Sequence, residues 1–184
     1  MITKNKTICQ LKRLLFSLLL PAAITTAIPL QAQTCTSKLP RQLRVASYNI
    51  QHGVGMDHKL DYKRIANVLE DINPDVVAIQ EVDSMTRRTG NTYSLGEIAD
   101  HRRNYASYAP AISFDGGKYG IGILSRKRPI RTEQHALPGR EEARTLLVAE
   151  FDDYVFAATH LSLTEADLMA SISIIENVAK KCDK

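Results

Sequence analysis

Three residues whose types could support catalysis each follow an apolar run: Asn49 in RVASYNIQHG, Glu81 in DVVAIQEV and His160 in YVFAATHL. A carboxylate together with an amide oxygen suits a hard cation such as Mg²⁺, which takes oxygen ligands and keeps several waters. A histidine beside such a cation could contact or protonate a phosphate oxygen. Because strand ends open onto loops where distant segments converge, these residues are candidates for one metal-assisted site.

Each of these residues also has a purely structural interpretation. Asn49 could cap a loop, Glu81 could be a solvated charge at a strand end, and His160 could be a hydrogen-bonded core histidine. An amide at the end of a buried strand needs a partner, because an unsatisfied polar group there costs about 1–3 kcal/mol. The spacing alone does not show that the three side chains meet.

Apolar patterns predict the strands that would position these residues. Val45, Ala46 and Ile50 indicate a buried strand over 43–50. A near-continuous apolar run over 75–82 indicates a second one. Further strands are expected at 105–111, 121–125, 144–151 and 154–161, with the last two forming a hairpin, and 86–92 is expected to be a basic, turn-rich loop.

A helix is predicted between the first two strands. Asp61 is a suitable N-cap, and Ile65, Val68, Leu69 and Ile72 give the following turns one apolar face at helical spacing. Two further helices are expected at 95–103 and 164–181. Strands dominate and helices connect some of them, so the fold class is mixed α and β.

Four segments together resemble the endonuclease/exonuclease/phosphatase family, and the resemblance extends from about Leu43 to Ser162. They are RVASYNIQHG, PDVVAIQEVD, YGIGILSRKRPI and EEARTLLVAEFDDYVFAATHLS, in this order. The resemblance implies a four-layered α/β sandwich, in which two packed mixed β-sheets are flanked by helices. It also implies a phosphoesterase that depends on Mg²⁺ or Mn²⁺.

Individual roles follow from this resemblance. Glu81 matches the metal-binding glutamate, and Asn49 matches an asparagine of the first strand that helps to orient an active-site water or phosphate. His160 matches a residue that contacts the phosphate, and Arg144 matches an arginine that organises the site. Asn49, His160 and Arg144 are thus the expected catalytic residues, and Glu81 and Asn49 are the expected metal ligands.

Other polar residues carry weaker signals. Arg87 and Arg88 lie in the loop after Glu81, where family members often approach substrate, so a phosphate contact and a solvated loop are both open. His52 and His58 are expected to be surface residues of the first loop. The glycines of GKYGIG precede a strand rather than a helix, so they are expected to serve the turn and the sheet.

The family pattern continues beyond THLS with a GDFN strand, a further Asp and a terminal SDH, and this chain of 184 residues contains none of them. In the family these segments activate the attacking water and supply another metal ligand. Residues 43–184 are therefore expected to be the N-terminal portion of a C-terminally incomplete domain, which is inactive alone. The alternative is a non-catalytic exported remnant or binding protein on the same half-fold.

The N-terminus has the order of a secretory signal. Four basic residues precede the run LLFSLLL, and small residues follow near Ala32, so residues 1–32 are expected to be a cleaved signal peptide and 33–42 a polar linker. A membrane anchor, or a lipoprotein attached through Cys35, is the alternative to an exported protein. Export would also permit a disulfide between Cys35 and Cys182.

Removal of the signal changes what the charge implies. Residues 1–32 hold four of the 24 Lys and Arg and none of the 20 Asp and Glu, so the formal charge falls from +4 to 0. A neutral chain argues against an extended, processive DNA-binding surface. The substrate is left open as a nucleic acid, a phospholipid head group or a small phosphoester, and no obligate protein partner is implied.

Overall fold

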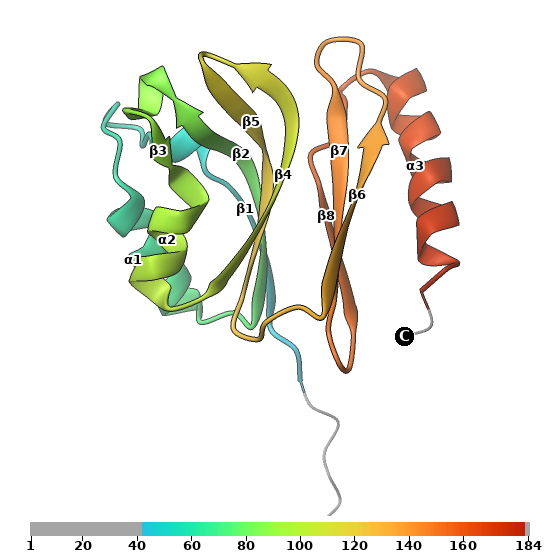
Figure 1. Cartoon of the computed structure of the whole chain (residues 1–184), viewed down its shortest axis with the longest axis horizontal. Helices are drawn as coiled ribbons and strands as arrows, with labels where there is room; N and C mark the ends of the chain where they lie inside the picture. Colours follow the sequence, from blue (N-terminus) through green and yellow to red (C-terminus); the bar gives the residue numbers. More distant parts are fainter. Residues whose placement is uncertain (1–41, 183–184) are drawn as a thin grey trace, which may run out of the picture. The chain divides into compact units, whose positions relative to one another are not determined.

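Residues 42–182, described here by a computed structural model, form four layers in the order helices, sheet, sheet, helix (Figure 1). The predicted signal peptide and Cys35, with nearly all of the predicted linker, lie outside the described residues. The elements are β1 (Val45–Asn49), η1 (Gln51–Gly53), α1 (Tyr62–Ile72), β2 (Val76–Thr86), η2 (Arg87–Thr89), β3 (Thr92–Tyr93), α2 (Ser94–Arg102), β4 (Tyr105–Phe114), β5 (Gly117–Ser125), β6 (Arg131–Leu137), β7 (Arg144–Glu150), β8 (Val155–Thr159) and α3 (Glu165–Ala179).

The two sheets differ in strand direction. The first has five strands in the order β1-β2-β5-β4, with β3 paired to β2 beyond this path. Its β1–β2 pair is parallel and the others are antiparallel, so this sheet is mixed. The second sheet, β6-β7-β8, is antiparallel throughout. The predicted four-layered α/β sandwich is confirmed, except that its second sheet is not mixed within the described residues.

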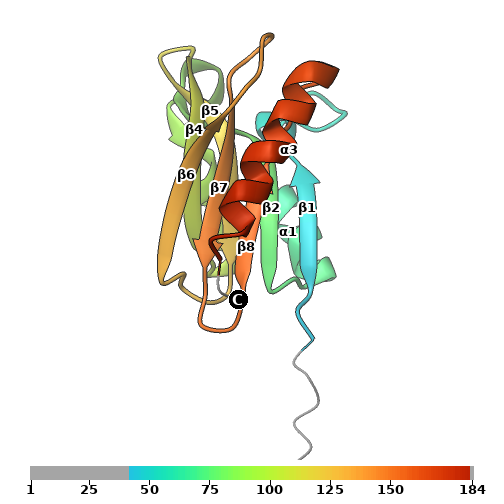
Figure 2. The ribbon, with the colours of Figure 1, turned by 90° about the vertical axis from the view of Figure 1, so that its right-hand side faces the viewer.

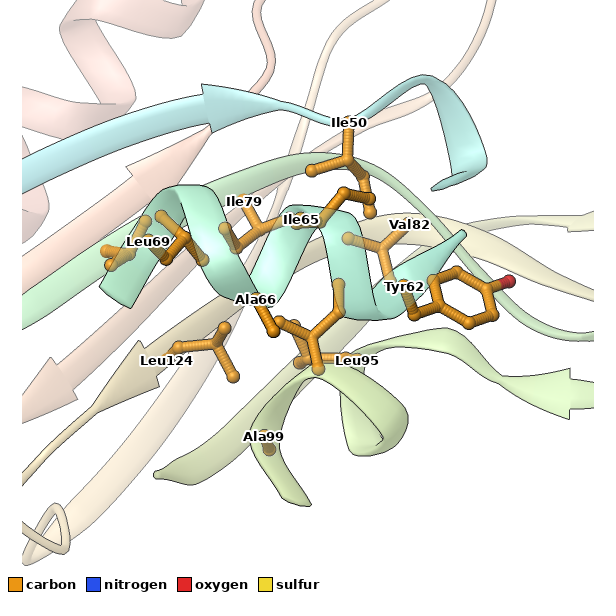
Figure 3. Close-up of a cluster of buried hydrophobic side chains, with 12 residues drawn as sticks. Ile50, Tyr62, Ile65, Ala66, Leu69, Ile79, Val82, Leu95, Ala99 and Leu124 are labelled. Atoms are coloured by element: carbon orange, nitrogen blue, oxygen red, sulfur yellow. The ribbon is translucent and has the colours of Figure 1, made fainter. Parts of the chain in front are cut away.

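The first helix forms as its sequence predicts. The Asp61 carboxylate accepts a hydrogen bond from the Arg64 backbone N–H, which caps the first turn of α1. Ile65 and Leu69 point into the core, whereas Val68 and Ile72 lie at the margin of the apolar face and are more exposed than expected. Figure 3 shows the cluster that α1 and α2 form with the first sheet. Its buried members are Ile50, Tyr62, Ile65, Ala66, Leu69, Val77, Ile79, Val82, Leu95, Ile98, Ala99 and Leu124.

Two further apolar clusters join the remaining layers. Residues of β2, β4 and β5 meet residues of β7 and β8 between the sheets, with Phe151 almost fully buried among them. Figure 2 shows α3 running across the three-stranded sheet, which it contacts through residues such as Ile175 and Val178. Cys182, just beyond this helix, carries a free thiol. Within residues 42–182, every helix is too short or too polar to cross a membrane.

Three expectations about strands were wrong. The first strand is an edge strand rather than a buried one, and Val45 is 52% exposed. The second strand does not end near Val82 but continues to Thr86, so Glu81 lies inside it. The strand β6 was not expected, because of its seven residues only Leu137 is buried and an apolar pattern is therefore missing.

The glycines of GKYGIG serve the sheet, as expected. A Cβ on Gly120 would lie 2.2 Å from the carbonyl oxygen of Ala109, and one on Gly117 would lie 2.3 Å from that of Ser84. Both positions bring β5 against a neighbouring backbone more closely than a side chain permits. The approach at Gly117 places β5 beside β2, the strand that carries Glu81, and the approach at Gly120 places it beside β4.

Candidate functional site

Asn49 and Glu81 meet at the end of β1. The Asn49 Nδ2 donates a hydrogen bond of 2.6 Å to Glu81 Oε1, and the Asn49 Oδ1 accepts one of 3.1 Å from the Gln51 backbone N–H. The parallel pairing of β1 with β2, in which Asn49 lies opposite Gln80, brings the two side chains together. The Asn49 amide is exposed rather than buried, and it orients the Glu81 carboxylate through its nitrogen while its oxygen faces the loop.

Glu81 occupies a β-bulge. The pairing of β2 with β5 shifts between Ile79, opposite Gly122, and Val82, opposite Gly120. Two residues of β2 therefore face a single residue of β5, and Glu81 adopts a left-handed φ of 59°. A non-glycine residue in this conformation costs about 1–3 kcal/mol, and such strain is found at functional sites. The bulge turns Glu81 out of the alternation of the strand and toward Asn49.

The other residue of the bulge connects the two sheets. Gln80 Nε2 donates hydrogen bonds to Ser47 Oγ at 3.1 Å and to the Thr159 carbonyl oxygen at 3.5 Å. Thr159 is the last residue of β8, and His160 follows it directly. Gln80 therefore ties the strand that carries Glu81 to the strand end that carries His160.

A cavity of about 260 Å³ lies beside Glu81, and we call it the Glu81 cavity. Its lining comes from the loop after β1, from β2 and η2, from the β4–β5 hairpin and from the loop before β7. The lining residues are Gln51, His52, Glu81, Arg88, Phe114, Tyr119 and Glu142.

Arg88 reaches the Glu81 cavity as a fixed cation. Its Nε and Nη2 donate hydrogen bonds of 2.6 and 2.7 Å to the two carboxylate oxygens of Asp83, whose side chain is fully buried. The guanidinium also lies 4.4 Å from the centre of the Phe114 ring. Arg87 turns the other way, pairs with Asp115 and is 75% exposed. The structure thus brings Arg88, but not Arg87, to the cavity.

A second, smaller cavity of about 10 Å³, the His160 cavity, is roughly the size of one water molecule. Its lining includes His160 and Arg144, and it shares Tyr119 and Glu142 with the Glu81 cavity. The Arg144 side chain is only 10% exposed and forms ion pairs with Glu141 and Glu142. Its buried Nε has no hydrogen-bond partner within the described residues.

The loop before β7 is fastened to the segment that carries His160. Glu141 accepts hydrogen bonds from Ser162 Oγ at 2.9 Å and from the Leu163 backbone N–H at 3.0 Å. The bond from Ser162, with those from the backbone of Glu141 itself, from the Leu163 backbone and from Arg144, lowers the pKa of Glu141 to about 2. Glu141 therefore holds the β8–α3 connection in place, while its neighbour Glu142 faces the Glu81 cavity.

Five residues that line the Glu81 cavity were not among the candidates from the sequence: Gln51, His52, Phe114, Tyr119 and Glu142. The expectation that His52 is a surface residue was wrong, because it is partly buried in the wall of this cavity. Gln51 and His52 adopt left-handed φ angles of 45° and 48°, which direct the loop into the cavity. Burial, with the nearby Arg88 cation, lowers the pKa of His52, so its imidazole is neutral at pH 7. His58 is exposed, as expected. The only sequence signal for Glu142 is its place in EEAR.

The donor set fits a hard divalent cation held largely by substrate and water. Within residues 42–182, no three His, Cys, Asp or Glu side chains are grouped so that they could hold a metal ion by themselves. Mg²⁺ commonly binds through one or two carboxylates together with phosphate oxygens and waters. Glu81 offers such a carboxylate at the edge of a cavity, and Asn49 fixes its orientation.

Comparison with known proteins assigns the fold to a family. A family model described as Endonuclease/Exonuclease/phosphatase family matches residues 46–163, more than half of the chain. No curated protein matches the chain in sequence.

Solved structures agree with this match. An endonuclease/exonuclease/phosphatase from Beutenbergia cavernae has a TM-score of 0.60 at 21% identity, over 73% of this chain and 43% of its own. A family protein from Leptotrichia buccalis has a TM-score of 0.58 at 13% identity, over 74% and 63%. A mannosyl-6-phosphatase from Bacteroides thetaiotaomicron has a TM-score of 0.56 at 16% identity, over 76% and 60%. The chain thus spans between 43% and 63% of the length of these structures.

Proposed function

The chain belongs to the endonuclease/exonuclease/phosphatase family, and on that premise we propose that it provides the metal- and phosphate-binding part of a phosphoesterase. The observation that carries the proposal is the Asn49–Glu81 pair at a strained bulge beside a cavity that also contains Arg88. The left-handed backbone at Glu81 costs stability and orients the carboxylate, so ligand binding explains it better than a structural role does.

Each residue has a role in this proposal. A bound Mg²⁺ or Mn²⁺ would polarise the phosphoryl group and stabilise the leaving oxygen. Glu81 holds the cation, and Asn49 keeps the Glu81 carboxylate in one orientation. His160 contacts the phosphoryl group from the end of β8, and Arg144 positions the loop that closes the His160 cavity.

The substrate belongs to the phosphoesters as a class. The Glu81 cavity of about 260 Å³ accommodates a phosphoryl group with a small leaving group. One structure of the same fold is a mannosyl-6-phosphatase, which supports a small phosphoester alongside a nucleic acid or a phospholipid head group.

Metal binding by the chain tests the proposal directly. Loss of the electron paramagnetic resonance signal of free Mn²⁺ measures binding, with Glu81→Gln as the variant and Glu176→Gln, on the exposed face of α3, as the matched control. Glu81→Gln should weaken Mn²⁺ binding at least tenfold, because it removes the charged ligand, and Glu176→Gln should not. Equal binding by the wild type and Glu81→Gln would contradict the assignment.

Hydrolysis is best measured in a chimera that completes the domain with the C-terminal part of a family member. There Asn49→Ala and His160→Ala should each lower kcat by about 10²-fold or more without rescue by metal. Glu81→Gln should instead be partly rescued by excess Mn²⁺. Wild-type kcat in all three variants would refute the active-site assignment.

We also propose that the protein is exported after cleavage of residues 1–32. The basic residues, the apolar run and the small residues near Ala32 support this proposal. N-terminal sequencing of the protein from fractionated cells should give Gln33 as the first residue. Recovery of the uncleaved chain in the cytoplasm would contradict it.

A further inference from the structure

Tyr119 lines both cavities of the site, and we call the place where the two linings meet the junction of the two cavities. Among the described residues, only Tyr119 and Glu142 line both the Glu81 cavity and the His160 cavity. Tyr119 lies opposite Asp83 in the β2–β5 pairing. Its ring centre is 6.1 Å from that of Phe114 and 5.6 Å from the Arg88 guanidinium. Since Arg88 is itself fixed by Asp83, the Tyr119 ring has a defined position in the wall of the site.

The Tyr119 hydroxyl is available as a donor. It makes no hydrogen bond with any other residue between positions 42 and 182. Burial, together with the carboxylates of Glu81 and Glu142, raises the pKa of Tyr119. The phenol therefore keeps its proton throughout the neutral and mildly alkaline range.

Resting on the function proposed above, we propose that the Tyr119 hydroxyl donates a hydrogen bond to the phosphoryl group of the substrate. A phosphoryl group that contacts both a cation on Glu81 and the His160 side chain would lie at the junction of the two cavities. Of the two residues at that junction, Glu142 is a carboxylate that accepts hydrogen bonds and is already paired with Arg144. Tyr119 is the donor, and it carries no charge that would compete for the cation.

The test uses the chain itself with saturating Mn²⁺. Isothermal titration calorimetry measures its affinity for inorganic phosphate. Tyr119→Phe removes only the hydroxyl and keeps the ring. Tyr105→Phe, at the opposite end of the β4–β5 pair, is the matched control. Tyr119→Phe should lower phosphate affinity about tenfold, since a hydrogen bond to a charged group is lost, while Mn²⁺ affinity stays within about twofold of wild type. Tyr105→Phe should change neither affinity.

A second measurement distinguishes a direct contact between Tyr119 and phosphate from an effect of the substitution on protein stability. In protein labelled with ¹³C at tyrosine Cζ, the Tyr119 signal should shift when phosphate is added, and the Tyr105 signal should not. Unchanged phosphate affinity in Tyr119→Phe, with or without a lower melting temperature, would overturn this inference and leave the proposed function standing. A wild-type chain that binds neither Mn²⁺ nor phosphate would overturn both.

Discussion

Arg87 and Arg88 are neighbours in one loop, yet replacing each with alanine should have very different effects on stability. Asp83 is fully buried and accepts three short hydrogen bonds, two from Arg88 and one of 2.6 Å from Thr86 Oγ. Arg88→Ala would leave the Asp83 carboxylate buried with Thr86 as its remaining partner. Breaking a buried pair by removing one member costs about 3–5 kcal/mol. Because Arg88 is 32% exposed and water can enter, we expect about 3 kcal/mol.

Arg87→Ala is the internal control. Its pair with Asp115 is at the surface, where such pairs contribute about 0–1 kcal/mol. Urea unfolding, followed by circular dichroism and tyrosine fluorescence, measures both variants. In the Arg88→Ala background, adding Asp83→Asn should recover part of the loss, since it removes the unpaired charge. A difference between the two alanine variants below about 1 kcal/mol would refute this account of the Asp83–Arg88 pair.

Two more predictions concern the elements around the site. The folded pKa of Glu141, about 2 against its usual 4.5, means that its contribution to stability is present above pH 4.5 and is lost as the pH falls toward 2. The urea midpoint of Glu141→Gln should therefore fall less than that of wild type over this range, and parallel curves would contradict the bonds to Ser162 and Leu163. Gly120→Ala should destabilise the fold by more than about 2 kcal/mol, because its Cβ would meet the Ala109 carbonyl, whereas Gly90→Ala, with open space around it and a φ of 66°, should cost about 1 kcal/mol. Urea unfolding of both alanine variants measures these costs, and equal costs would exclude the close approach of β5 to β4 as the cause.

The sequence predicts elements well where the apolar pattern and the local capping signals agree. Asp61 caps α1 as expected, and the strands on either side of Asp152-Asp153 pair as a hairpin. The strand β6 gives no such signal, because its exposed side chains, such as Arg131 and Glu133, form ion pairs rather than a core. Its place in the sheet comes from pairing with β7, which a local pattern cannot reveal.

The sequence indicated the candidate residues at the strand ends, but not the other residues that line the two cavities. Asn49 and His160 follow apolar runs, so their positions at the edge of the sheets can be read from the sequence. The bulge at Glu81 is hidden, because DVVAIQEV contains no glycine there and the polar pair Gln80-Glu81 suggests the end of a strand rather than a bulge within it. Tyr119 and Glu142 reach the cavities from other loops and strands, and only the packing of the two sheets brings them there.

At position 81 the backbone conformation and the side chain favour different residue types. Glycine would relax the left-handed conformation of the bulge, but it would remove the carboxylate. Any redesign of this scaffold that selects for stability alone should therefore favour glycine here and give a more stable protein that lacks the proposed metal ligand. The residue type found at this position in a related chain would then report whether that chain has been kept for its chemistry or only for its shape.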